Sequence, residues 1–337
     1  STSASSKRAV VIWLSVMCAL VALMIVVGGA TRLTDSGLSI TEWRPVTGTI
    51  PPLSEADWLS EFEKYKTIPE YHQVNLGMSL AEFKTIYWWE WGHRFLGRVI
   101  GLVFLVPLVF FALTRRIDRK LGAKLLSLFM LGGLQGALGW WIVSSGLTDR
   151  VDVSQYRLAA HLGLALLLFA AMLWIALDLS APPVRRARHR LAPFAIALLA
   201  VVYAQMILGA FVAGLRAGRV YNTWPLMDGR VIPEAYFESS PRFLDLFETT
   251  AAVQFNHRVG AYALFAAAAA MLIAARKSPL ERRARMLFGV IFAQAVLGVW
   301  TLVAGTPLAL GLAHQAMALI VLSTALYLCL LYTSDAA

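Results

Sequence analysis

Long apolar segments separated by charged connections dominate this sequence. Two apolar segments, residues 91–113 and 252–275, carry arginine near one end only, and residues 286–334 are uncharged but divided by Gly305-Thr306-Pro307. Four further segments have no charged residue over 20 positions or more: residues 10–30, 125–146, 158–177 and 191–215. A bilayer core about 30 Å thick takes about 20 helical residues. The pattern therefore predicts an all-α membrane protein with eight transmembrane helices.

Composition and charge agree with a membrane protein and give it an orientation. Only 15% of the residues are charged, against about 25% in soluble domains. The net charge of +10 comes from basic clusters at the amino terminus and in every second connection: residues 7–8, 115–124, 185–190 and 276–285. That side carries 16 basic and 4 acidic residues, and the other side 14 and 16. The positive-inside rule places both termini in the cytoplasm, and this distribution argues against a nucleic-acid partner.

The second half of the chain repeats the first. Gln135 to Trp141 resembles Gln294 to Trp300, His161 matches His314, and His93-Arg94 matches His257-Arg258. Four spans bring the chain back to its starting side, so both halves enter the membrane in the same direction. The repeat predicts two pseudo-symmetric four-helix bundles, residues 10–180 with a long outer loop at 32–88, and residues 191–331.

Four histidines lie in the even-numbered spans, each near the predicted outer end: His93, His161, His257 and His314. The other two, His72 and His189, lie in loops and are interpreted as solvated. A single histidine in a span is often a packing residue, but ionisable groups inside a membrane are costly and usually functional. Two imidazoles from facing helices suit axial ligation of haem, whereas zinc normally takes three or four protein ligands. The repeat thus predicts one haem in each half.

Arginines accompany these histidines. Arg94 and Arg98 follow His93, and Arg258 follows His257. Guanidinium groups bind carboxylates in a bidentate fork, so these side chains are candidates for binding haem propionates. The alternative is that they extend to lipid phosphates.

Glu90 marks a difference between the two halves. It precedes His93 by three residues, which places it on nearly the same helix face, and Gln254 holds the matching position before His257. A carboxylate transfers protons or stabilises developing positive charge, and an amide does neither. Glu90 is therefore the candidate catalytic residue, and an ion pair with Arg94 is the alternative interpretation.

Four motifs resemble those of the haem A synthase family of bacteria and mitochondria: residues 28–39, 90–94, 221–229 and 254–258. The resemblance covers residues 10–331 and implies an oxidoreductase that converts the C8 methyl group of haem O to the formyl group of haem A, for assembly of terminal oxidases. Some members carry a cysteine pair in the outer loops. Here Cys18 and Cys329 lie in the first and last spans, so the chain resembles the branch without that pair.

The resemblance also assigns roles to the site residues. It implies that His257 and His314 ligate a resident haem b, that His93 and His161 ligate the substrate haem O, and that Glu90 is the acidic residue beside the substrate. It further implies a multi-pass protein of the bacterial inner membrane with its sites towards the periplasm. The expected partners are haem O synthase as the donor of haem O, an unidentified electron acceptor, and further copies of the chain in a homo-oligomer.

Two other functions fit parts of the pattern. A di-haem membrane cytochrome would carry electrons without changing haem O. A transporter with parallel repeats would hold its polar residues near the midplane, whereas here they gather at one end of the spans.

Overall fold

The structure, a computed structural model, describes residues 4–148, 150–181, 190–237 and 243–330. His189 and most of the basic cluster at 185–190 lie outside these ranges. Within them the regular structure is helical, and eight helices are long and apolar enough to cross a membrane. They are α1 (Ala4–Leu33), α4 (Leu80–Leu113), α5 (Arg119–Ser144), α6 (Gln155–Ser180), α7 (Ala192–Gly214), α9 (Thr250–Ala274), α10 (Glu281–Val303) and α11 (Leu308–Cys329). The eight predicted spans are confirmed.

The chain forms two compact units. One consists of Ser1–Ser6 and Ala19–Leu168, and the other of Lys7–Cys18 and Phe169–Ala337. The division falls inside α1 and α6, so these units differ at their edges from the sequence halves 10–180 and 191–331. The two halves therefore stay a prediction from the repeat.

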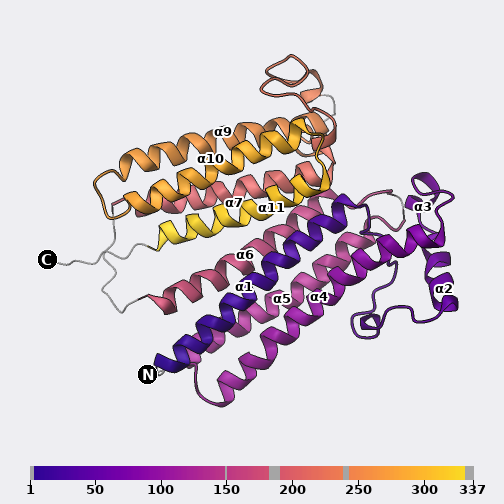
Figure 1. The fold of residues 1–337 in the computed structure, drawn as a ribbon, viewed down its shortest axis with the longest axis horizontal. Coiled ribbons are helices and arrows are strands. Elements are labelled where there is room, and N and C mark those ends of the chain that lie inside the picture. Colours follow the sequence, from indigo (N-terminus) through magenta and orange to yellow (C-terminus); the bar gives the residue numbers. More distant parts are fainter. Residues whose placement is uncertain (1–3, 149, 182–189, 238–242, 331–337) are drawn as a thin grey trace. The chain divides into compact units, whose positions relative to one another are not determined.

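The second unit contains a closed bundle of four long helices. α7 packs against α9 and α11, and α10 also packs against α9 and α11, as the adjacent ribbons in Figure 1 show. α10 and α11 are separated at the predicted break: α10 ends at Val303, Gly305 takes a φ of +78°, and Pro307 precedes α11. A positive φ costs glycine little, and proline is favoured where a helix begins.

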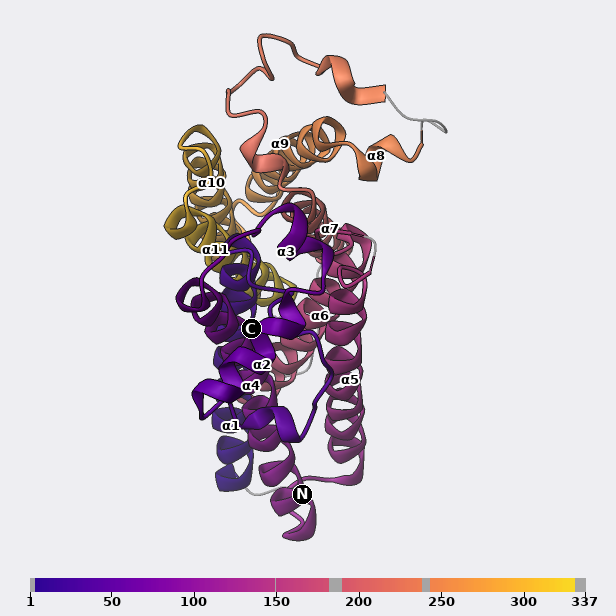
Figure 2. The same cartoon turned by 90° about the vertical axis from the view of Figure 1, so that its right-hand side faces the viewer.

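The long loop of the first unit is a folded structure. It contains η1 (Thr47–Thr49), α2 (Glu55–Tyr65) and α3 (Pro69–Gln73), and α2 packs on α4; Figure 2 looks onto this end of the unit. Its buried cluster includes Trp58, Phe62, Tyr65, Phe83 and Tyr87. Burial, together with the nearby Glu70 carboxylate, raises the pKa of Tyr65 well above its ordinary value, so the phenol stays protonated.

The start of the second span differs from the prediction. α4 begins at Leu80, whereas the hydropathy pattern placed the start of the span at residue 91. Ser79 caps the helix by a capping box with Glu82, and the added turns bury Phe83 and Tyr87 in the loop cluster. These turns are amphipathic and pack against protein, so a search for uniformly apolar segments misses them.

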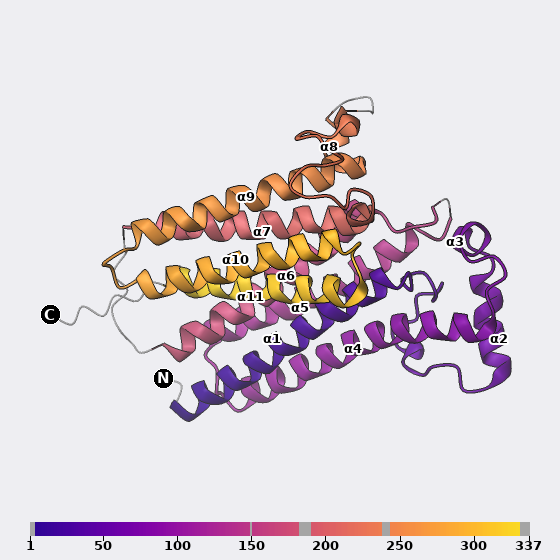
Figure 3. The same ribbon diagram turned by 45° about the horizontal axis from the view of Figure 1, so that its top comes forward.

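The shorter loop of the second unit contains η2 (Ala217–Arg219), η3 (Glu234–Phe237) and α8 (Asp245–Glu248), and α8 leads into the start of α9 (Figure 3). The carbonyl of Gly218 accepts hydrogen bonds from Asn222 and Thr306 at 2.7 and 2.8 Å. These bonds hold the loop against the connection between α10 and α11.

Candidate functional site

The four intramembrane histidines form two pairs, one in each compact unit. His93 on α4 and His161 on α6 are close enough to interact electrostatically. His257 on α9 and His314 on α11 interact in the same way. Structure thus brings the histidines together in the pairs that the sequence repeat predicts.

Each imidazole lies against a glycine of a neighbouring long helix. A Cβ atom added to that glycine would approach the ring to between 2.8 and 3.3 Å, closer than ordinary van der Waals contact. The pairs are Gly28 with His93, Gly139 with His161, Gly209 with His257, and Gly298 with His314. The same arrangement therefore holds all four rings, because only glycine leaves room for the imidazole at that distance.

The donor set of each site suits haem. Nδ1 of His161 and Nδ1 of His314 are buried without a hydrogen-bond partner among the described residues, which is costly unless a ligand or a changed ring orientation satisfies them. Within the same part of the chain, no three His, Cys, Asp or Glu side chains gather as a metal site. Two imidazoles without further ligands match the axial ligation of haem iron.

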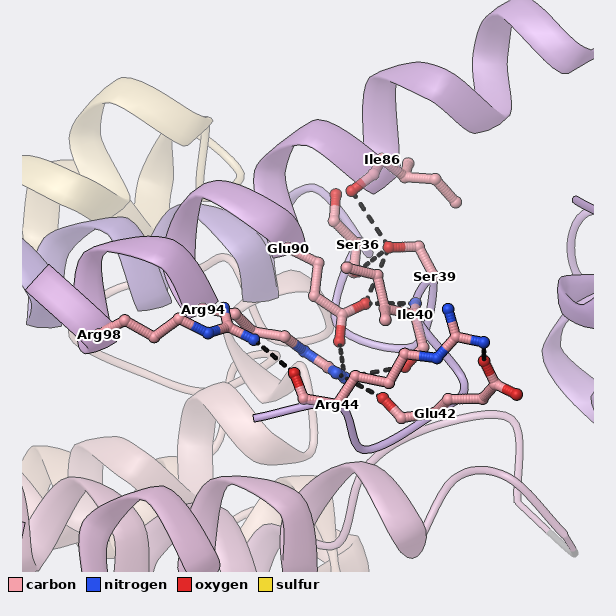
Figure 4. Close-up of polar contacts among 9 residues, drawn as sticks. All are labelled: Ser36, Ser39, Ile40, Glu42, Arg44, Ile86, Glu90, Arg94 and Arg98. Atoms are coloured by element: carbon pink, nitrogen blue, oxygen red, sulfur yellow. Dashed lines mark hydrogen bonds and ion pairs between the residues drawn. The ribbon is translucent and has the colours of Figure 1, made fainter. Parts of the chain in front are cut away.

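Glu90 is buried in the first unit and accepts hydrogen bonds at both oxygens (Figure 4). Oε2 accepts from Ser39 Oγ and from the backbone N–H of Ile40, each at 2.8 Å. Oε1 lies 2.5 Å from the guanidinium of Arg94. The ion pair with Arg94 that the sequence offered as an alternative is therefore present, and it is part of a wider contact between α4 and the loop.

Arg94 and Arg98 bind the backbone of that loop. Arg94 donates to the carbonyls of Ile40 and Glu42 at 2.8 and 2.9 Å. Arg98 donates to the carbonyls of Arg44 and Pro45 at 2.7 and 2.8 Å. We call these contacts, together with those of Glu90, the loop clamp. Nη1 of Arg98 is buried and has no partner among the described residues.

The second unit has a matching clamp in which the neutral amide of Gln254 replaces the carboxylate. Gln254 donates to the carbonyl of Ala217 at 2.7 Å, and Arg258 donates to Gln254 Oε1 at 2.8 Å and to the carbonyl of Tyr221 at 3.0 Å. Nε of Arg258 is buried without a partner within the described residues. The carboxylate of Glu90 accepts from the loop, whereas the amide of Gln254 donates to it, so the two positions differ in charge and in hydrogen-bond direction.

Sequence reasoning missed the groups that surround the histidines. Three of the four glycines that contact the rings follow a glutamine by four residues. They were visible as Gln-x-x-x-Gly at 135–139, 205–209 and 294–298. Two of these occurrences belong to the repeat itself, but the pattern in residues 205–209 was not recognised. Ser39 and Ile40 were also missed, because nothing local in the sequence indicates that a loop folds back onto Glu90.

Comparisons with a family model and with individual proteins agree on one family. Residues 11–326 match the cytochrome oxidase assembly protein family. The chain is 55% identical to a heme A synthase of Parvibaculum lavamentivorans over 323 residues, which are 96% of this chain and 94% of that protein. It is 53% identical to the heme A synthase of Rhodopseudomonas palustris strain HaA2, covering 94% and 88% of the two chains. For the heme A synthase of Azorhizobium caulinodans the identity is 52%, and the coverage is 96% and 94%.

These likenesses extend over nearly the full length of the chain, and the family match at residues 11–326 covers the range in which both histidine pairs and both loop clamps lie. With an identity above one half to several curated relatives, and with the family match spanning all eight membrane helices, this chain belongs to the haem A synthase family.

Proposed function

We propose that this protein is a haem A synthase, an enzyme that oxidises the C8 methyl group of haem O to a formyl group. The observation that carries the proposal is the presence of two half-buried histidine pairs, each ring lying against a glycine, in a chain whose relatives bear that name. Haem, when bound, supplies the redox chemistry. Protein side chains bind the haem, orient it, and hold or move protons.

The two histidine pairs have different roles. His257 and His314 hold a resident haem b, and His93 and His161 hold the substrate haem O. The asymmetry between the clamps supports this division, because the buried carboxylate of Glu90 lies one helical turn from His93, and the second unit has Gln254 at the matching position.

Glu90 acts as the catalytic group of the first site. It is one helical turn from His93, and its burial removes competing water from the carboxylate. A carboxylate in such a place accepts a proton or stabilises positive charge that develops on the substrate. Its contacts with Ser39 and Ile40 fix the orientation of the carboxylate and join the site to the loop.

Arginines remain the candidates for binding the propionates. Arg94 donates two hydrogen bonds to the loop. Only the N–H groups that those bonds leave over could bind a propionate. Arg98 and Arg258 each keep a buried N–H without a partner among the described residues, and an anionic propionate oxygen would satisfy it.

The expected setting is the bacterial inner membrane, with both sites towards the periplasm. Haem O would arrive from haem O synthase, an unidentified acceptor would take the electrons, and the protein would function alone or as a homo-oligomer. The eight apolar helices and the distribution of basic residues support this setting.

Production of haem A tests the function directly. Cells that make haem O but lack haem A should accumulate haem A when they express this chain, as measured by chromatography of extracted haems. The purified protein should also show the absorption spectrum of a six-coordinate haem b. Protein that carries haem without any change of haem O in the cells would instead be a di-haem cytochrome.

Reporter fusions test the topology. A fusion after Lys120 should place the reporter in the cytoplasm, and one within residues 54–66 should place it outside, because basic residues concentrate on the first side. Alkaline phosphatase, which is active only outside, provides the measurement. High phosphatase activity from the Lys120 fusion would overturn the eight-span orientation.

A further inference from the structure

A glutamine approaches three of the four histidines from the helix that carries the facing glycine. Gln135, Gln205 and Gln294 each precede that glycine by four residues, so both residues lie on one helix face. Their amide nitrogens donate to the backbone carbonyls of His161, His257 and His314 at 2.9, 2.8 and 3.0 Å. The histidine is thus held at its main chain as well as at its ring.

In the second unit the amides also reach the rings. Gln205 Nε2 lies 3.0 Å from Nδ1 of His257, and Gln294 Nε2 lies 3.5 Å from Nε2 of His314. The three amide oxygens are buried and have no donor among the described residues. An amide has a donor and an acceptor side, so it partners an imidazole nitrogen in either protonation state. In both contacts the amide nitrogen is the donor, so the ring nitrogen accepts.

His93 lacks this support. Four residues before its glycine, Gly28, stands Met24, whose thioether is a weak acceptor and no donor. Met24 and Gln205 hold equivalent positions in the two units. Cε of Met24 packs against Gly97, one turn beyond His93. The amide of Gln205 packs against Gly260, one turn beyond His257. Within the described part of the chain, no hydrogen bond reaches the imidazole of His93. The four histidines therefore differ in the number of glutamine contacts that hold them: two for His257 and His314, one for His161 and none for His93.

The hydrogen-bond partners around a ligating histidine help to decide how firmly it holds its metal. They fix the orientation and tautomer of the ring, and their loss typically lowers metal affinity by about 10–100-fold. By this rule His257 and His314 are the most firmly positioned, His161 is held through its backbone only, and His93 is the least constrained.

We propose that Gln135, Gln205 and Gln294 are positioning residues for the axial histidines, and that Met24 makes His93 the ligand that opens when haem O enters and haem A leaves. This inference rests on the proposed function and deepens it, because it names the exchangeable ligand of the substrate site. A methionine at position 24 leaves His93 free to turn away from the iron, whereas the glutamines keep the resident haem in place.

Reciprocal substitutions test the proposal. Met24→Gln adds an amide beside His93 and should slow the transfer of haem O or haem A from the purified enzyme to apomyoglobin by roughly 10-fold or more. Gln205→Met should speed the loss of the resident haem b by a similar factor.

Gln73→Met, at an exposed position on α3, is the matched control and should change neither transfer rate. If Gln205→Met does not accumulate, Met24→Gln carries the test alone. An unchanged transfer rate in Met24→Gln would overturn the proposal while leaving the proposed function intact. Wild-type protein that binds no haem at all would instead overturn the proposed function, and this inference with it.

Discussion

Alanine in place of His257 or His314 should leave the purified protein almost without haem b, whereas alanine in place of His93 or His161 should leave haem b bound and abolish haem A formation. Under the proposed assignment, each of the first two substitutions deletes an axial ligand of the resident haem and leaves a cavity against Gly209 or Gly298. Each of the other two does the same to the substrate site. The expected fall in haem b per protein is roughly tenfold or more.

Haem extraction and the absorption spectrum of the purified variants provide the measurement. His72→Ala is the control, because His72 is an exposed residue of α3 and its removal should change neither haem content nor turnover. Equal loss of the same pigment in all four variants would mean that the two pairs do not have separate roles.

Glu90→Gln should lower haem A formation by about 10²–10⁴-fold, the usual effect of removing a catalytic acid or base. Haem O or a partly oxidised haem should accumulate in the cells. The structure adds a complication that the sequence did not reveal. Both oxygens of Glu90 accept hydrogen bonds, and glutamine keeps only one acceptor oxygen, so this variant also weakens the loop clamp.

The size of that second effect decides how the experiment is read. A buried donor left without its acceptor costs about 1–3 kcal/mol, and every 1.4 kcal/mol is about a factor of ten. Ser39→Ala is the matched control, because it removes one contact of the clamp and keeps the carboxylate. We expect Ser39→Ala to lower haem A formation less than tenfold. Similar losses in the two variants would show that Glu90 serves the loop and not the chemistry.

The sequence predicted the fold well because its signals are local. The length of each span and its lack of charge are visible in the sequence. The break at Gly305-Thr306-Pro307 is visible as well, because these residues end a helix. The amphipathic start of α4 was missed for the same reason. Phe83 and Tyr87 are buried by a loop, and hydropathy along one segment says nothing about a partner dozens of residues away.

The candidate site was only partly predictable. Internal repetition picked out the histidines and the contrast between Glu90 and Gln254. It did not indicate that Arg94 and Arg98 bind backbone oxygens of the loop, since main-chain acceptors leave no trace in residue types. The difference between Met24 and Gln205 was likewise hidden, because it becomes meaningful only when the glycines facing the rings are known.

The loop clamp has a consequence for how this protein tolerates change. Arg94 and Arg98 bind four carbonyl oxygens, those of Ile40, Glu42, Arg44 and Pro45. Every amino acid provides such an oxygen, so side chains in residues 40–45 can be exchanged while the acceptors stay in place. An insertion or deletion there would instead shift the acceptors out of register with arginines fixed one turn apart on α4. Related chains should therefore vary in the composition of this segment and agree in its length.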